Sequence, residues 1–363
     1  MKFNTKYIKL FSCCIPIKGA SRSSLCDVQR NVVKLIPNAL YKLIPFFDSQ
    51  NIDDIICRYG AEHSETVKEY IDFLIENDFA FYCSKDELEC FPPINISEFH
   101  IPFHISNAII ELDGIDKEKI LHIIDELNSV ECPALEIRVQ TIIEISEIET
   151  MLSLFNNPKV NVTELHVIII DNEFTLEKLK PLFERHMRLT SLVIGGAPEN
   201  KRHTDFFFGN SQIIFTTRNV HLPTCCGNFA PEQFVINLPF FTESQHYNTC
   251  LNRKVAIDKD GNIKNCPSMS RSFGNISNTK VVDIIENKEF TAKWNINKDQ
   301  ISICQDCEFR HVCMDCRAYL EDPDDDYSKP LKCGYNPYTM EWEDWSQNPL
   351  KKLTMKHYNL KDL

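Results

Sequence analysis

The stretch that decides the fold of the last third of this chain is Cys304-Gln-Asp-Cys307-Glu-Phe-Arg-His-Val-Cys313-Met-Asp-Cys316. It places four thiols within thirteen positions, in two C-x2-C steps. Thiols that are buried only for packing follow the period of a helix or a strand, and these do not. Two C-x2-C steps allow two pairs of thiolates to turn around one soft metal centre. The stretch therefore predicts metal ligation.

A single zinc site made of these four thiols would leave other cysteines of the same region, Cys250, Cys266 and Cys333, without a role. Cys250 and Cys266 flank Ala256-Ile-Asp-Lys-Asp-Gly261-Asn-Ile263, which reads as a strand, a glycine turn and a second strand. We expect this hairpin to hold its two thiols at opposite ends of a rigid frame.

Composition limits the class of protein. The chain has 363 residues, 43% of them hydrophobic and 25% charged, as in a globular protein with a substantial core. Its formal charge of −13 provides no basic field for a phosphate backbone, so nucleic acid is not an expected partner. The apolar stretch at residues 10–15 is too short for a signal peptide, and no window approaches 18 apolar residues. We therefore expect a cytoplasmic protein without membrane association, whose sixteen cysteines are thiols and metal ligands rather than disulfides.

Residues 1–98 predict a small α+β unit. Two apolar segments, Tyr7–Cys14 and Ser24–Leu35, lie on either side of Gly19 and suggest a hairpin. Three short helices are expected, the first with Leu40 on its apolar face, the second over Ile52–Tyr59 and the third from Ser64. A closing strand is expected at Phe79–Cys83. This order is typical of a winged-helix-like unit, and a generic α+β cap is the alternative.

Residues 99–224 show a strand–helix rhythm with a spacing of roughly 25–30 residues, the length of a βα unit. The expected strands are Asn107–Leu112, Leu135–Val139, Leu165–Ile170, Leu192–Ile194 and Ile213–Thr216. The expected helices are Lys117–Leu127, Ser146–Phe155 and Leu176–Phe183. The strands are rich in Ile, Val and Leu, as when helices cover a parallel sheet. Five strands are too few for an eight-stranded barrel, so an α/β fold is predicted, with a partial (βα) barrel or an open parallel sheet.

Two other residue types receive a structural interpretation. The histidines at positions 104, 122, 166 and 186 fall in separate elements without paired spacing, so we expect each to be structural. Trp342 and Trp345 follow the last cysteine and are expected to cover the cysteine-rich domain.

The order Cys250-x10-Gly261-x4-Cys266, then Cys304-x2-Cys307-x5-Cys313-x2-Cys316, then Cys333 resembles the SPASM domain of peptide-modifying enzymes. Neighbouring words agree, among them Cys266-Pro267, Phe273-Gly-Asn-Ile276 and Cys316-Arg-Ala318. The final C-x2-C step departs from the C-x3-C of many members. The resemblance implies a SPASM iron–sulfur domain over residues 225–363.

The whole chain resembles, more narrowly, the SPASM-domain peptide maturases of grasp-with-spasm ribosomal peptide systems. The supporting stretches include Cys14-Ile-Pro-Ile-Lys-Gly-Ala20, Cys26-Asp-Val-Gln-Arg30 and Tyr335-Asn-Pro-Tyr338. This resemblance implies a precursor peptide as substrate and an ATP-grasp ligase as partner. The unit at residues 1–98 resembles leader-recognition elements, which extend their sheet with a strand of the peptide.

The resemblance also implies two 4Fe–4S clusters, which require eight thiolates. Cys304, Cys307, Cys313 and Cys333 would hold an outer cluster. Cys250, Cys266 and Cys316 would hold an inner one, with an eighth ligand from Cys225 or Cys226. Cys226 is favoured because Gly227 leaves room for a ligating turn. The alternatives are an inner site with only three protein ligands, and zinc in place of iron.

One expected motif is missing. Enzymes with this domain normally carry an upstream C-x3-C-x2-C motif for the cluster that cleaves S-adenosylmethionine, and residues 1–224 contain none. S-adenosylmethionine is therefore not an expected cofactor, and residues 99–224 read as a reduced form of the radical-SAM βα domain. Two functions remain: an iron–sulfur peptide maturase acting with the ligase, or a non-catalytic peptide-binding adaptor stapled by zinc or iron. A redox enzyme is a weaker third possibility.

Overall fold

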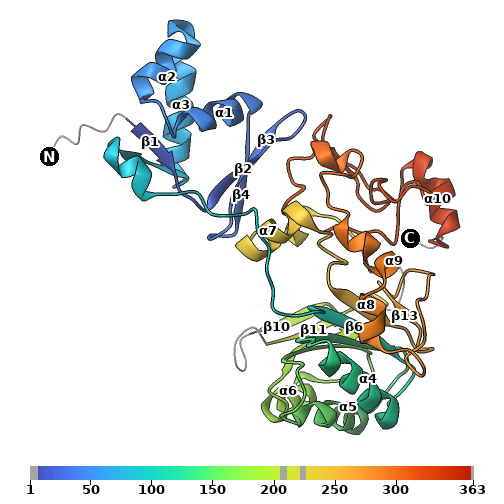
Figure 1. Ribbon diagram of the computed structural model, residues 1–363. Helices are drawn as coiled ribbons and strands as arrows, with labels where there is room; N and C mark the ends of the chain where they lie inside the picture. Colours follow the sequence, from blue (N-terminus) through green and yellow to red (C-terminus); the bar gives the residue numbers. More distant parts are fainter. Residues whose placement is uncertain (1–6, 205–210, 221–225, 361–363) are drawn as a thin grey trace.

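A computed structural model describes residues 7–204, 211–220 and 226–360. Figure 1 shows an N-terminal unit at the top, a sheet layer covered by helices at the bottom, and the C-terminal third beside and between them. Among the described helices, none combines the length and the apolar composition that a membrane crossing requires.

The N-terminal unit contains two small sheets and three short helices. Its elements are β1 (Tyr7–Leu10), β2 (Cys14–Ile17), β3 (Ser23–Asp27), β4 (Val32–Ile36), α1 (Asn38–Leu43), η1 (Ile44–Phe46), α2 (Ile52–Tyr59), η2 (Ala61–His63), α3 (Ser64–Glu76), β5 (Ala80–Cys83) and η3 (Asp86–Cys90). Strands β2, β3 and β4 form an antiparallel sheet in chain order, whereas β1 pairs with β5. The second and third helices and the closing strand are confirmed. The predicted hairpin is present as β2–β3, and Tyr7–Leu10 pairs elsewhere; the likeness to a winged helix stays a prediction.

Local signals explain where the helices of this unit begin and end. The side chain of Asn51 accepts a hydrogen bond from the Asp54 amide at 2.9 Å and caps α2. Gly60 ends the same helix with φ = 92°, a conformation that costs glycine little. Leu40, Ile55 and Leu74 from the three helices are buried in one apolar cluster.

A mostly parallel sheet of eight strands forms the lower layer, in the order β10-β11-β9-β8-β7-β6-β12-β13. Its strands are β6 (Asn107–Leu112), β7 (Ala134–Val139), β8 (Glu164–Ile170), β9 (Leu189–Gly195), β10 (Lys201–Thr204), β11 (Gln212–Thr216), β12 (Lys254–Ile257) and β13 (Ile263–Lys264). Only the edge strands β10 and β13 are antiparallel to their neighbours. All five predicted strands are confirmed, and the sheet is open rather than closed. Strand β10 was not predicted.

Helices α4 (Lys117–Ser129), α5 (Ile145–Ser153) and α6 (Leu176–Arg185), with η4 (Leu154–Asn156), lie on one face of this sheet (Figure 1). The Asp116 carboxylate accepts hydrogen bonds from the amides of Glu118 and Lys119 and so begins α4. Side chains such as Ile120, Ile137 and Val167 are fully buried between helices and sheet. The three predicted helices are confirmed because one strong apolar face determines each of them.

The C-terminal third contains short elements joined by turns. They are η6 (Pro231–Gln233), α7 (Leu238–His246), α8 (Val281–Ile285), α9 (Lys288–Thr291), η7 (Ala292–Asn295), η8 (Cys304–Asp306), β14 (Tyr335–Asn336), β15 (Glu341–Trp342), η9 (Pro349–Lys351) and α10 (Lys352–His357). Strand β12 pairs in parallel with β6, with Ala256 beside Ile109, so the predicted hairpin of this third extends the sheet of the middle third. The cysteine-rich region is therefore built directly onto the parallel sheet.

Candidate metal centres

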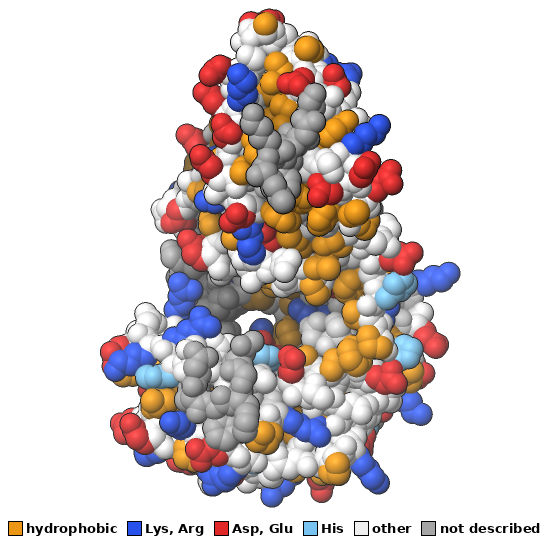
Figure 2. Space-filling view, turned by 90° about the vertical axis from the view of Figure 1, so that its left-hand side faces the viewer, with side chains coloured by type: hydrophobic (Ala, Val, Ile, Leu, Met, Phe, Trp, Pro, Cys, Tyr) orange, Lys and Arg blue, Asp and Glu red, His pale blue; other side chains and the backbone are white. Residues whose placement is uncertain are grey.

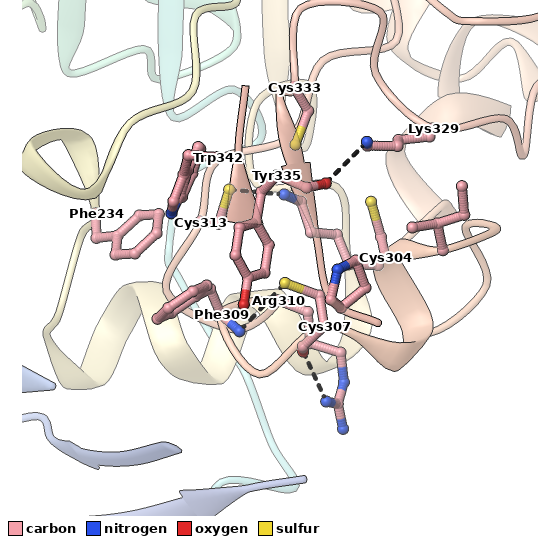
Figure 3. Close-up of a pocket in the computed structure, with 13 residues that line it drawn as sticks. Phe234, Cys304, Cys307, Phe309, Arg310, Cys313, Lys329, Cys333, Tyr335 and Trp342 are labelled. Carbon is pink, nitrogen blue, oxygen red and sulfur yellow. Dashed lines mark hydrogen bonds between the residues drawn. The ribbon is translucent and has the colours of Figure 1, made fainter. Parts of the chain in front are cut away.

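The outer set consists of Cys304, Cys307, Cys313 and Cys333. Figure 3 shows their sulfur atoms around one space, and together they line a cavity of about 370 Å³. Phe309, Tyr335 and Trp342 close the cavity with aromatic rings. The structure thus brings the four residues of this predicted set together in a dry, apolar pocket.

Short turns position the thiols of the outer set. Cys304 begins η8 and Cys307 ends it. The Phe309 amide donates a hydrogen bond to the Cys307 sulfur at 3.4 Å. Ile303, directly before the first thiol, has φ = 67°, which is strained for a β-branched residue. Strain of this kind persists only where the surroundings fix the backbone, as they do at ligand-binding loops.

The inner set consists of Cys226, Cys250, Cys266 and Cys316. Burial raises the pKa of the Cys316 thiol, and the neighbouring Cys250, Cys266 and Cys226 raise it further, which places the four close together. Gly227 has φ = 72°, and a Cβ atom there would lie 2.9 Å from the Cys316 sulfur. The backbone room expected beside Cys226 is therefore present. Cys225 lies outside the described residues.

The hairpin β12–β13 carries two thiols of the inner set, but not as expected. Cys250 precedes β12 and Cys266 follows β13, so both lie at the open end of the hairpin rather than at opposite ends. Antiparallel pairing of Ala256 with Lys264 brings the two flanking segments together.

A buried polar network fixes the loop between the two sets. Asn248 donates from Nδ2 to Oδ2 of Asp315 at 2.5 Å, and the Asp315 amide donates to Thr249 Oγ1 at 3.0 Å. Arg317 donates from Nη2 to Oδ1 of the same aspartate at 2.9 Å. Asp315 lies between Cys313 and Cys316, and Thr249 directly precedes Cys250. The network therefore ties the last thiols of both sets to the segment that begins the hairpin.

Each set contains one lysine. Lys298 is buried and donates from Nζ to the Cys313 sulfur at 3.0 Å. Half-buried Lys254 donates to the Cys250 sulfur at 3.6 Å. Burial lowers the pKa of both lysines, but the adjacent thiolates outweigh it and the pKa of each is raised. Each set is thus built to hold negative charge on sulfur next to one ammonium group.

The thiols themselves resist ionisation without a metal. Burial raises the pKa of both Cys266 and Cys304 to about 12. These thiols keep their protons at neutral pH unless a metal displaces them, so metal uptake releases protons. Iron or zinc would supply the positive charge that this environment lacks.

The spacing of the sulfur atoms bears on which group they fit. A tetrahedral zinc–thiolate site has sulfur atoms about 3.8 Å apart, from Zn–S bonds of about 2.3 Å. Within the described ranges, the one group of three metal-type ligand atoms that all lie within 4.8 Å of one another is Cys13, Cys14 and Asp27. The eight thiols are spaced more widely than that, as suits an iron–sulfur cluster in which each thiolate binds its own iron.

The compact group at Cys13, Cys14 and Asp27 has a structural explanation. The Asp27 carboxylate accepts hydrogen bonds from the amides of Gln29 and Arg30 and from Nε of Arg30 at 2.5 Å. Burial raises the pKa of both Cys13 and Cys14. An occupied carboxylate and two protonated thiols make a turn, not a metal site.

The face of the sheet opposite its helices carries polar side chains that were not singled out in the sequence. In register across β7, β8, β9 and β11 lie Glu136, His166, Ser191 and Gln212. Arg138 pairs with Glu136 at 2.6 Å, and the thiolates of Cys226 and Cys266 contribute to its raised pKa after Glu136. This row therefore faces the inner set. Figure 2 shows the surface hollowed between the sheet layer and the parts above it.

This polar row was readable in principle. Strand β7 has the sequence Ala-Leu-Glu-Ile-Arg-Val, in which buried and half-buried positions alternate. Alternation of this kind indicates that only one face is covered by helices. His166, which was expected to be structural, belongs to the row. His186 is buried and its Nδ1 lies 3.2 Å from Asn156 Oδ1, in keeping with the expected structural role.

Comparison with known proteins gives one family match and several likenesses of fold. Residues 249–308 match the SPASM family, an iron–sulfur cluster-binding domain. A search of curated proteins finds no match.

Among solved structures, SuiB of Streptococcus suis bound to S-adenosylmethionine is 10% identical, with a TM-score of 0.36, over 89% of this chain and 98% of that one. SuiB bound to its precursor peptide SuiA is 9% identical, with a TM-score of 0.31, over 89% and 98%. BtrN in complex with AdoMet and 2-DOIA is 13% identical, with a TM-score of 0.35, over 62% and 98%. These likenesses are distant. The family match is specific: the C-terminal third of this chain contains a SPASM iron–sulfur cluster-binding domain.

Proposed function

We propose that this chain is an iron–sulfur peptide maturase of a grasp-with-spasm system. It binds a ribosomally made precursor peptide and acts with an ATP-grasp ligase in modifying that peptide. The observation that carries the proposal is the pair of four-thiol sets, each with its own lysine, inside a SPASM domain.

Each set holds one 4Fe–4S cluster in this proposal. Cys304, Cys307, Cys313 and Cys333 bind the outer cluster, and Cys226, Cys250, Cys266 and Cys316 bind the inner one. When bound, such clusters supply one-electron transfer. The lysines offset the charge of the thiolates, and the aromatic lining of the outer cavity excludes water.

The three regions then have separate roles. Residues 1–98 recognise the peptide, residues 99–224 form a reduced βα domain, and residues 225–363 carry the clusters. Edge strand β4 offers an unpaired backbone edge, and its Leu35 side chain is 43% exposed. A peptide strand added there would gain main-chain hydrogen bonds and one apolar contact.

The reaction in this proposal does not depend on cleavage of S-adenosylmethionine. Residues 1–224 lack the C-x3-C-x2-C spacing that would hold the cluster for it. The polar row of Glu136 and His166 lies where a peptide side chain could meet the inner set. We propose that these two residues position the reacting part of the peptide and exchange protons with it.

Co-expression tests the proposal. The precursor peptide and the ATP-grasp ligase are expressed with or without this chain, and the mass of the peptide is measured. We expect a mass change that requires the chain. The variant Leu35→Glu should reduce it, and Leu353→Glu, at a residue 79% exposed on α10, should not. Identical peptide masses with and without the chain would contradict the proposal.

A non-catalytic adaptor is the second candidate, favoured by the missing C-x3-C-x2-C motif. An adaptor would deliver the peptide to the ligase through a metal-stapled fold. In that case His166→Ala would leave the peptide product unchanged, whereas the maturase proposal expects the product to be lost while the iron content remains.

A further inference from the structure

The turn between β2 and β3 lies directly on the loop that carries an outer thiol. The Ala20 amide donates to the Asp306 carbonyl at 2.8 Å, and Ser24 Oγ donates to the Glu308 carbonyl at 2.6 Å. Cys307 lies between these two acceptors. In Figure 1 the β2–β3 loop points toward the C-terminal third.

A buried charge network reinforces this contact. The Glu308 side chain is fully buried, and its Oε1 accepts from Arg22 Nε at 2.7 Å and from the Tyr335 hydroxyl at 2.5 Å. Arg22 also donates from Nη2 to that hydroxyl at 3.1 Å. Tyr335 lines the cavity of the outer set. A buried carboxylate of this kind is costly to leave unpaired, so the network holds only while both sides keep their positions.

Close packing demands the same accuracy. A Cβ atom at Gly19 would lie 2.9 Å from Glu308 Cβ, so the turn touches the loop backbone. Ile17 and Val28 of the N-terminal unit share an apolar cluster with Phe309 and Cys313. The contact thus requires residues 306–313 to adopt one conformation.

Little regular structure fixes that conformation. Between residues 301 and 316 the chain forms the three-residue η8 and turns, without a long helix or strand. Three outer thiols, Cys304, Cys307 and Cys313, emerge from this stretch. Ligation of such thiols supplies folding free energy that the local backbone lacks. An unligated loop of turns belongs to the least stable parts of a protein.

We propose that the outer cluster has a structural function: it docks the N-terminal unit. Ligation of Cys304, Cys307, Cys313 and Cys333 fixes the loop at residues 306–310, and that loop binds the β2–β3 turn through Glu308. Iron loading thereby controls whether the unit is held against the SPASM domain. This inference rests on the proposed function, in that the outer set must hold a cluster.

Hydrogen–deuterium exchange of the full chain tests the inference. The protein is prepared anaerobically with its iron, and again after iron removal by a chelator. We expect exchange of the Ala20 amide and its neighbours in residues 18–24 to become about tenfold faster or more after iron removal. Amides of β6 (Asn107–Leu112), in the centre of the sheet, serve as the internal reference and should not change.

Two pairs of variants locate the effect. Cys304→Ala should release residues 18–24, whereas Cys266→Ala, in the inner set, should not. Arg22→Met should release them with the iron content unchanged, since it breaks the contact from the other side. Arg58→Met, which removes an arginine stacked on Phe46 in the same unit, should do neither.

Several results would overturn the inference. They are unchanged exchange at residues 18–24 after iron removal, equal release by Cys304→Ala and Cys266→Ala, and no release by Arg22→Met. Any of these in iron-containing protein leaves the proposed function standing. Absence of iron from the anaerobic protein overturns both.

Discussion

The outer and inner thiol sets use the same donors in different surroundings. The outer set lies in an aromatic pocket beside Lys298, and its loop contacts the N-terminal unit. The inner set lies beside Lys254 and faces the polar row of Glu136 and Arg138 on the sheet. The difference indicates a division of labour, in which the outer set serves structure and the inner set lies near the position for chemistry. The predictions below test whether the two sets are separable.

The largest expected effect comes from removing one thiol from either set. Cys304→Ala should lose the outer cluster and Cys266→Ala the inner one, each leaving about four irons per chain of about eight. Iron analysis of anaerobically purified variants measures this. A variant that loses all its iron would mean that the sets are a single unit.

Gly227→Ala should selectively damage the inner set. The new Cβ atom would meet the Cys316 sulfur at 2.9 Å, and the backbone has a positive φ. We expect about half of the iron to be lost.

The matched control is Gly196→Ala, where φ = 78° and nothing lies within 4 Å of the added atom. This change should cost about 1–2 kcal/mol of stability through the backbone alone and leave the iron unchanged. Equal iron loss in both variants would show that the close approach at Cys316 is unimportant.

Removing a lysine should change the electronic properties of one cluster only. Lys298→Met takes a buried positive charge from beside Cys313, so reduction of the outer cluster becomes less favourable. A loss of about 1–2 kcal/mol of charge interaction lowers a one-electron potential by roughly 40–90 mV. Lys254→Met should do the same for the inner cluster. Potentiometric titration followed by electron paramagnetic resonance measures both, and a shift of the wrong cluster would contradict the assignment.

The smallest effect is expected at the covering tryptophans. Trp342 lines the outer cavity, and Trp345 packs beside Cys316 and Tyr319 of the inner region. Trp342→Ala should speed loss of the outer cluster in air by about two- to threefold, because water and oxygen gain access. Trp345→Ala should affect the inner cluster instead. Absorbance decay in air, with iron analysis, separates the two.

The regular parts of the fold follow from local patterns. Strand β6 was predicted at its observed bounds because Ile and Leu fill both faces of a buried parallel strand. Strand β10 was missed because Lys-Arg-His-Thr carries no apolar signal and forms only by pairing with β11. Local sequence predicts an element when the element buries its own apolar side chains.

The site was partly predictable for a different reason. Spacing of thiols indicated metal ligation without geometry, because ligand chemistry alone requires that pattern. The contact of Arg22 with Glu308 joins residues 286 positions apart, and no periodicity encodes it. The position of Cys250 beside Cys266 depended on where a short hairpin opens, which side-chain pattern does not specify.

Elemental analysis of the anaerobically purified full chain tests the central claim most directly, since it counts iron, acid-labile sulfide and zinc per chain. Two 4Fe–4S clusters predict about eight irons and about eight sulfides, with zinc near zero. One or two zinc ions without sulfide would contradict the account.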